Sequence, residues 1–343
     1  MKIPWIKNDQ AVAPPGIRPA TPLTMEFYVA KSTTRSRGRF LSRVAVAAIT
    51  AALVGTTVGS AQAAPAPKPS PAEKAAAAAA PQQAPRQAAP KGTLRAAAVA
   101  QPQHALFGIT TGDDAYIYGP NGTGGYGARE YVTPGYSFKF AAQSHNSDEP
   151  GGYSAGIWTW DYAGQLSFSG DAGTTELGGG WGVYNQILSP GDLAGAAGAD
   201  LIARDGDGTL WLYLGYGDGR LTAKTKIGGG WGQYTQIAGL GDVSGDGRAD
   251  IVARDGSGTL WLYEGNGDRN DPFASRVRIG GGWNMFNALV GAGDLDGDGL
   301  SDLIARGTDG SLWRYSGTGN PLSPFAARVQ IGTSGWNAYR LMF

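Results

Sequence analysis

The sequence contains no cysteine and only two histidines, His104 and His145, among its 343 residues. The absence of cysteine excludes disulfide bonds, thiolate zinc sites and cysteine nucleophiles. The sequence also lacks a Gly-x-Ser-x-Gly elbow, a histidine-rich metal motif and a phosphate-binding loop. We therefore expect a protein that is not an enzyme, with a glycan hydrolase that works through paired carboxylates as the minority alternative.

Positive charge is scarce in the C-terminal part of the chain. From residue 104 onward there are 15 Lys and Arg against 25 Asp and Glu, although the formal net charge of the whole chain is zero. Binding to a phosphate backbone requires clustered Lys and Arg side chains. A nucleic-acid partner is therefore not expected.

Long apolar runs are missing as well, apart from one short run near the N-terminus. The basic segment 31–43 precedes the apolar segment Val44–Val54 and a small-x-small site at Ala61–Ala63. This order is typical of a secretory signal peptide, and the run is shorter than the roughly 20 residues of a membrane span. Residues 1–63 are predicted to be the signal peptide region, with Met25 as the suspected start. We therefore expect a secreted, extracellular protein that keeps no stable membrane span after processing. The alternative is that the apolar run stays attached as an uncleaved membrane anchor.

Composition changes twice after this region. Residues 64–103 are rich in Ala, Pro and Gln, which favours an extended chain with no apolar face to bury. We predict a disordered linker there. Residues 104–343 hold nearly all the Gly, Asp and Trp and are expected to fold.

Glycine, with 56 residues, is abundant and marks an internal repeat. A Gly-Gly-Gly-Trp motif ends at Trp181, Trp231 and Trp283, and looser copies end at Tyr136 and Trp336. A second motif between them alternates an apolar segment, a Gly/Asp turn and Leu-Trp-x-Tyr, which predicts a β-hairpin. Its copies are Ala199–Tyr213, Ala249–Tyr263 and Ser301–Tyr315. Further strands are expected near 222–227 and near 234–237, the latter as the fourth strand of its unit.

Four strands in a unit of about fifty residues are typical of one propeller blade, which must stack on neighbours to bury its faces. The five ring positions predict an all-β, five-bladed β-propeller over residues 104–343. We expect Ala105–Thr110 to pair with Asn337–Phe343, because this pairing closes the ring and removes an exposed sheet edge.

Two families resemble these repeats. The Gly-Gly-Trp and Leu-Trp-x-Tyr motifs resemble the tachylectin-like five-bladed propellers, which implies sugar binding, with N-acetyl sugars among the ligands. The Gly-Asp-x-x-Gly-Asp-Gly-x-x-Asp loops resemble FG-GAP/VCBS repeats, which are known from integrin-type propellers and many secreted bacterial proteins.

Clustered carboxylates in these loops point to structural calcium. Oxygen donors at positions 1, 3 and 5 followed by glycine at position 6 wrap a loop around a hard cation, and position 7 offers its backbone carbonyl. One loop supplies Asp294, Asp296, Asp298, Leu300 and Asp302, and another supplies Asp242, Ser244, Asp246, Arg248 and Asp250. A simple turn without metal is the alternative. The first copy, from Asp192 to Asp200, lacks donors at positions 3 and 5 and is expected to use its aspartates only as turn caps.

The aromatic residues allow two interpretations. Trp181, Trp231, Trp283 and Trp336 follow glycines and could either stack on a sugar or pack against a neighbouring blade. Trp211, Trp261 and Trp313 of the Leu-Trp-x-Tyr strands are predicted to pack between blades, and Arg204, Arg254 and Arg306 to bind a carboxylate of the adjacent blade or cover a Trp ring.

These features predict a secreted, calcium-stabilised, lectin-like module that recognises a glycan or another cell-surface polymer. The alternative is an adhesion or scaffold propeller that binds a protein partner through its rim.

Overall fold

The computed structural model describes residues 102–146, 155–170, 173–195 and 197–343. The predicted signal peptide region, Met25 and all but the last two residues of the predicted linker lie outside the described residues. Within the described ranges, none of the helices has the length and apolar character needed to span a membrane.

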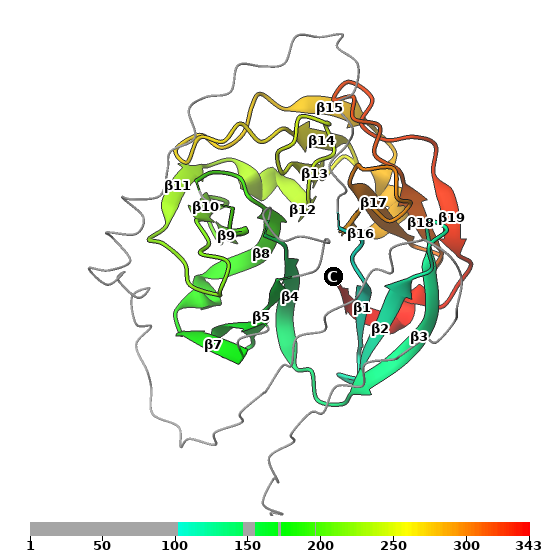
Figure 1. Cartoon of the computed structure of the whole chain (residues 1–343), viewed down its shortest axis with the longest axis horizontal. Helices are drawn as coiled ribbons and strands as arrows, with labels where there is room; N and C mark the ends of the chain where they lie inside the picture. Colours follow the sequence, from blue (N-terminus) through cyan, green and yellow to red (C-terminus); the bar gives the residue numbers. More distant parts are fainter. Residues whose placement is uncertain (1–101, 147–154, 171–172, 196) are drawn as a thin grey trace, which may run out of the picture.

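Five four-stranded antiparallel sheets surround a common centre in the part of the chain that the structure describes (Figure 1). Blade 1 contains β20 (Tyr339–Met342), β1 (Leu106–Thr110), β2 (Ala115–Pro120) and β3 (Tyr126–Thr133). Blade 2 contains β4 (Phe138–Ser144), β5 (Gly156–Asp161), β6 (Leu166–Gly170) and β7 (Gly173–Gly178). Blade 3 contains β8 (Tyr184–Gly191), β9 (Asp200–Asp205), β10 (Leu210–Tyr213) and β11 (Thr225–Gly228). Blade 4 contains β12 (Tyr234–Ala238), β13 (Ile251–Asp255), β14 (Leu260–Tyr263) and β15 (Val277–Gly280). Blade 5 contains β16 (Phe286–Gly293), β17 (Asp302–Gly307), β18 (Leu312–Tyr315) and β19 (Val329–Gly332). The predicted five-bladed β-propeller is confirmed.

The sequence repeat is out of phase with the blades. The strand near 234–237, predicted as the fourth strand of its unit, is β12, which pairs with β13 and opens the next sheet, so that prediction was wrong. The Gly-Gly-Gly-Trp turn causes the shift: Gly230 adopts a φ of 87°, and Trp231 begins the 3-10 helix η2 (Trp231–Gln233). The other Trp turns form η1 (Trp181–Val183), η3 (Trp283–Met285) and η4 (Trp336–Ala338). Each of these turns carries the chain to the neighbouring blade.

Ring closure follows the predicted pairing of the two ends of the domain. In blade 1, β20 lies antiparallel to β1, with Gly108 opposite Met342 and Ile109 opposite Leu341. Phe107 and Phe343 exchange backbone hydrogen bonds of 2.8 and 3.2 Å, and their rings stack with centroids 5.1 Å apart. The last strand of the domain therefore completes the first blade.

Apolar side chains and arginines join adjacent blades along their seams. One core cluster combines Leu210 and Leu212 of blade 3 with Trp231 and Ile251 of blade 4. Arg204 on β9 donates hydrogen bonds to the carbonyl oxygens of Trp231 at 3.2 Å and Tyr234 at 2.6 Å. Arg254 and Arg306 make the same links in the next two blades. These arginines bind backbone carbonyls across the seam and not the carboxylates or Trp rings that the sequence predicted.

The innermost strands β20, β4, β8, β12 and β16 surround a cavity of about 170 Å³. Its described lining consists mainly of apolar side chains such as Ile187, Ile237 and Leu289, with a few Gln and Ser and no charged side chain. The charged side chains of the described residues therefore lie outside this cavity.

Candidate functional site

Three equivalent segments of equal length lie where the innermost strand leads into the second strand in blades 3, 4 and 5. They are called the blade 3 loop (192–200), the blade 4 loop (242–250) and the blade 5 loop (294–302). The blade 5 loop begins directly after β16, and its last residue opens β17. A loop held between two strands at both ends is well suited to fix its side chains.

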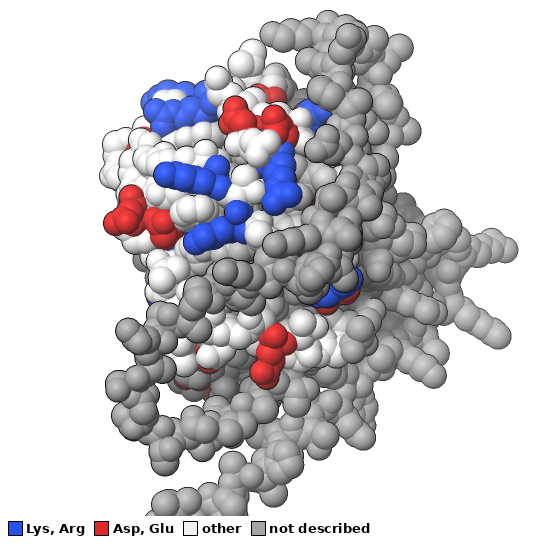
Figure 2. Space-filling view, turned by 90° about the vertical axis from the view of Figure 1, so that its left-hand side faces the viewer, with Lys and Arg blue, Asp and Glu red and all other residues white. Residues whose placement is uncertain are grey.

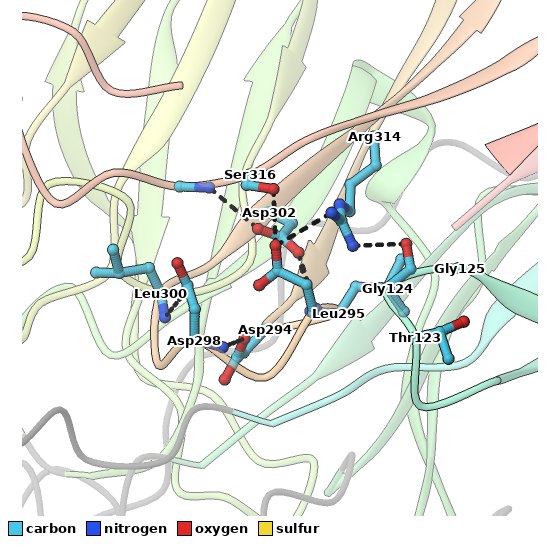
Figure 3. Close-up of polar contacts among 12 residues, drawn as sticks. Thr123, Gly124, Gly125, Asp294, Leu295, Asp298, Leu300, Asp302, Arg314 and Ser316 are labelled. Carbon is cyan, nitrogen blue, oxygen red and sulfur yellow. Dashed lines mark hydrogen bonds and ion pairs between the residues drawn. The ribbon is translucent and has the colours of Figure 1, made fainter. Parts of the chain in front are cut away.

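The blade 5 loop brings three predicted metal ligands together. Carboxylate oxygens of Asp294, Asp296 and Asp298 lie within 4.8 Å of one another (Figure 3). Asp294 accepts hydrogen bonds of 2.8 Å from the N–H groups of Asp298 and Gly299, which folds the loop back on its first residue. Burial raises the pKa of Asp294. Three carboxylates so close together form a donor set of hard oxygen atoms that fits a divalent cation.

The last aspartate of each loop has a different task. In the blade 5 loop, Asp302 accepts hydrogen bonds from the N–H groups of Leu295 at 3.0 Å, Asp296 at 3.3 Å and Gly317 at 3.0 Å. Burial raises the pKa of Asp302 to about 7, and the nearby carboxylate of Asp296 adds to the rise. Asp302 ties the start of the loop to the chain after β18. That Asp302 and the carbonyl of Leu300 also bind a cation stays a prediction.

Arg314 on β18 is a member of this site that the sequence analysis missed. Its guanidinium lies 3.2 Å from a carboxylate oxygen of Asp296, and it donates a 2.7 Å hydrogen bond to the carbonyl of Gly124 in blade 1 (Figure 3). Ser316 donates a further hydrogen bond of 2.7 Å to Asp296. The triad therefore has one protein cation beside it already, and this cation also links blade 5 to blade 1.

The blade 4 loop holds its predicted ligands more loosely. Asp242 accepts hydrogen bonds from the N–H groups of Gly245 and Gly247, and the Ser244 hydroxyl lies 3.4 Å from it. Asp246 accepts a bond from the N–H of Arg248, whose guanidinium lies 3.8 Å from the same carboxylate. Among the described residues, only the blade 5 loop gathers three acidic side chains within ligating distance of one another. The sequence offers a reason, since Ser244 stands where the blade 5 loop has Asp296.

The blade 3 loop provides an internal control. Asp200 accepts hydrogen bonds from Leu193 at 2.9 Å, Ala194 at 3.1 Å and Gly215 at 2.9 Å. Asp250 makes the equivalent three bonds in the blade 4 loop. The bonds of the last aspartate are therefore the same with and without the acidic residues at positions 3 and 5, and the turn-capping role predicted for Asp200 is present.

Three of the four tryptophans proposed as sugar platforms lie in the interior. Trp181, Trp231 and Trp283 are 3%, 7% and 7% exposed, and each packs on the Tyr of a Leu-Trp-x-Tyr strand. Trp336 is half-buried and packs on Tyr118, with ring centroids 4.6 Å apart. Because the rings pack inside the seams, the geometry favours the packing interpretation of these residues over stacking on a sugar.

The half-buried aromatic rings on the third strand of four blades each have a cation above them. These groups, called the seam sites, combine an aromatic ring with a Lys or Arg above it and a second ring beside it. The blade 1 seam site is Tyr116, Arg129 and Tyr339, and the blade 3 seam site is Trp211, Lys224 and Tyr184. The blade 4 seam site is Trp261, Arg276 and Tyr234, and the blade 5 seam site is Trp313, Arg328 and Phe286. Trp211, Trp261 and Trp313 also pack against the core clusters, as the sequence predicted, but the sequence analysis overlooked the cation that precedes the outermost strand in blades 3 to 5.

Comparison with protein families identifies the repeat. The pattern of the FG-GAP-like repeat matches residues 197–253 and 242–305, a range that contains the blade 4 loop and the blade 5 loop. No curated protein matches this sequence.

Several solved structures are similar to this chain at a distance. Human WBSCR16 has 13% identity and a TM-score of 0.32 over 67% of this chain and 66% of its own. A triple arginine mutant of AofleA from Arthrobotrys oligospora has 11% identity and a TM-score of 0.39 over 71% of this chain and 76% of its own. BBS1N, solved in complex with ARL6DN, matches over 64% of its own length, so this chain spans less than two thirds of it and of WBSCR16. No activity is transferred from matches this weak. The sheets show that the described chain is a five-bladed β-propeller, and residues 197–305 of it match FG-GAP-like repeats.

Proposed function

We propose that this protein is an exported, non-catalytic binding module that recognises glycans at its seam sites, on a ring stiffened by calcium. The observation that carries the proposal is the recurrence of one aromatic and cationic arrangement in four of the five blades. Aromatic faces and edges contact the apolar side of sugar rings, while cations and hydroxyls bind their polar groups. Several sites of modest affinity on one ring favour a polymeric ligand, because each bound site raises the effective concentration of the next.

The cation part of the proposal rests on the blade 5 loop. Its carboxylates, with a further backbone carbonyl at Leu300, match the oxygen ligands of calcium. Bound calcium would neutralise the triad and stiffen the turn between β16 and β17. The chain itself contributes the N–H groups that orient Asp294 and the contacts that fix Asp296.

A glycan array in the presence of calcium tests the proposal. The array should contain N-acetyl sugars, cell-wall fragments and acidic polysaccharides, and binding to at least one class is expected. A triple variant with Trp211, Trp261 and Trp313 changed to Leu should lose this binding while a thermal scan still shows cooperative unfolding. Uniformly flat binding on the array would overturn the glycan proposal. Release of reducing sugar from any bound polysaccharide would overturn the non-catalytic part.

The burial of the Gly-Gly-Gly-Trp rings favours a second candidate, a scaffold propeller that binds a protein partner. Trp231 is 7% exposed and contacts Tyr234, Tyr263 and Phe273. Replacing it by Ala should cost about 3–5 kcal/mol of stability, because a large ring leaves a cavity in the seam. If Trp231→Ala instead stays stable and loses sugar binding, the ring is a sugar platform and the scaffold candidate loses its support.

A further inference from the structure

The seam sites place their cations where a ligand can reach them. The charged ends of Lys224 and Arg276 lie 4.1 Å from the centroids of their Trp rings, and both residues are exposed. Arg328 lies 4.2 Å from the Trp313 ring and is half-buried, and the exposed Arg129 lies 4.8 Å from the Tyr116 ring. A cation held over a ring has lost much of its rotational freedom before any ligand binds, so ordering it costs little.

Neighbouring polar groups fix the floor of these sites. The indole N–H of Trp211 donates to Asp205 at 2.8 Å, and that of Trp261 donates to Asp255 at 2.9 Å. The other oxygen of each aspartate accepts backbone N–H groups of its own turn, as in the bond from Thr209 to Asp205. These carboxylates orient the Trp rings and are occupied by hydrogen bonds that the fold itself requires.

No carboxylate of the described residues lies within 4.0 Å of a seam-site cation, although Asp205 and Asp309 act electrostatically on Lys224 and Arg328 from farther away. The ion pairs within 4.0 Å in the described ranges belong to other arginines, namely Arg220, Arg248, Arg314 and Arg340. Figure 2 shows that Lys and Arg side chains gather on the upper part of the face that looks left in Figure 1, with a few acidic side chains among them. On an otherwise acidic domain, exposed cations without a paired carboxylate offer positions for anionic groups.

We infer that the glycan bound at the seam sites is an acidic polysaccharide, whose anionic groups are held by Arg129, Lys224, Arg276 and Arg328. This inference rests on the proposed glycan-binding function. An arginine already stacked on a ring by its face can still donate N–H groups from its edge to a carboxylate, sulfate or phosphate. The sugar ring that carries the anionic group then contacts the exposed part of the aromatic floor.

Blade 2 sharpens the assignment, because it lacks the arrangement. Ser167 stands at the place of the Trp in its third strand, and its cation, Lys139, lies over Trp160 on β5 instead. Acidic groups should therefore bind at the blade 1, 3, 4 and 5 seam sites and not at blade 2.

The test compares immobilised polysaccharides with the calcium-loaded protein. Polygalacturonate presents carboxylates, dextran sulfate presents sulfates and a teichoic acid presents phosphodiesters, whereas dextran and chitin fragments are neutral. We expect at least one acidic polymer to bind tenfold or more tightly than the neutral ones, and this binding to weaken as salt rises. The three acidic polymers also identify which anionic group is preferred.

A matched pair of variants locates the interaction. Changing Lys224 and Arg276 to Gln, which removes as many charges as the control, should weaken binding of the acidic polymer tenfold or more. The control changes Lys226 and Arg278 to Gln; both are exposed on the same outer strands, and neither lies over a ring among the described contacts. The control should stay within threefold of the unchanged protein. Lys224→Arg and Arg276→Lys keep the charge at each position. These variants should bind nearly as tightly as the unchanged protein, which keeps the test open if the Gln variant is unstable.

Each outcome is decisive. Binding to neutral glycans as tight as to acidic ones would overturn this inference and leave the glycan proposal standing, whereas no binding to any glycan would overturn both. Equal losses in the two variants, or equally tight binding of single-stranded DNA, would mean that diffuse charge is responsible and would overturn the seam-site assignment.

Discussion

The blade 3 loop and the blade 5 loop have the same length and lie between equivalent strands of their blades. Among the described residues, only the blade 5 loop brings three carboxylates within ligating distance of one another. Both end in a buried aspartate, Asp200 or Asp302, that accepts the same three backbone N–H groups. They differ at position 3, which is the buried Ala194 in one and Asp296 in the other. The comparison separates two roles that the repeat motif mixes: the last aspartate builds the loop, and the earlier ones create the cation site.

The difference also changes what each loop needs. In the blade 3 loop, Asp200 accepts its three backbone hydrogen bonds, and Ala194 forms a β-bridge with Gly267 of blade 4. The blade 5 loop concentrates negative charge that only Arg314 offsets at close range among the described residues. A cation should therefore stabilise the blade 5 loop and leave the blade 3 loop unaffected.

The largest expected effect comes from removing the shared aspartate. Asp200→Ala would leave the buried N–H groups of Leu193, Ala194 and Gly215 without acceptors, at a cost of about 3 kcal/mol or more. Urea unfolding should show the same loss with calcium and with a chelator. The control Asp218→Ala removes an exposed carboxylate and should change the stability by less than about 0.5 kcal/mol. If the two variants unfold alike, the last aspartate does not build the loop.

Calcium removal should have the next largest effect. At calcium concentrations about a hundredfold above the dissociation constant, binding stabilises the folded state by about 2.7 kcal/mol. A chelator should therefore lower the thermal midpoint by several degrees. The variant with Asp296 and Asp298 changed to Asn should respond little, while Asp207→Asn in the exposed turn of blade 3 should respond like the unchanged protein. No shift at millimolar calcium would make the blade 5 loop an ordinary turn, like its blade 3 counterpart.

The pH dependence should test the buried last aspartates that the three loops share, since burial raises the pKa of Asp200 in the blade 3 loop as well. Burial raises the pKa of Asp302 to about 7 and of Asp250 to about 8 in the absence of a cation. Because these folded-state values lie above the unfolded value of about 3.9, the stability they provide is full below about pH 4 and is lost as the pH rises through 7 to 8. With a chelator, the free energy of unfolding should fall by roughly 3 kcal/mol for each of these two aspartates between about pH 5 and pH 8.

Two variants check the origin of this slope. Asp302→Asn cannot ionise at this position and should flatten part of the decline. Asp255→Asn should leave it unchanged, because hydrogen bonds from Ser257 and Trp261 lower the pKa of Asp255 to about 2, so it titrates below this range. Saturating calcium should reduce the slope, and a stability that rises from pH 5 to 8 with the chelator would contradict the burial of these aspartates.

The sequence predicted the parts of the molecule that depend on local spacing. The blade count came from the regular positions of Tyr136, Trp181, Trp231, Trp283 and Trp336. The triad came from alternate positions of one loop, so neighbours in sequence became neighbours in space. The closure by β20 and β1 was predictable because the repeat ended in phase with its beginning. The assignment of β12 failed because the turn at Trp231 crosses a seam, and no local pattern distinguishes this from a return to the same sheet.

The contacts between segments that are distant in sequence could not be predicted from local spacing. The burial of Trp231 depends on Tyr263 and Phe273, which lie in separate segments of blade 4. For Arg314 one signal was present: the Leu-Trp-x-Tyr strands carry Leu212 and Leu262 at the position that Arg314 occupies in blade 5. A charged residue at an otherwise apolar position of a repeat indicates a partner specific to that repeat.

Arg314 provides the smallest but most specific test of the comparison between the loops. Arg314→Leu restores the residue of blades 3 and 4 and removes the positive charge beside Asp296. Because this guanidinium and a bound cation repel each other, the calcium affinity of the blade 5 loop should rise severalfold, or by about 1 kcal/mol, as measured by calorimetric titration. Arg248→Leu is the control, since Arg248 lies beside Asp246 in the blade 4 loop and should leave the affinity of the blade 5 loop unchanged. A weaker calcium affinity in Arg314→Leu would mean that Arg314 orients Asp296 for the cation and does not compete with it. In that case Arg314 and Asp296 together hold the cation, and the hydrogen bond from Arg314 to Gly124 of blade 1 would couple cation binding to ring closure.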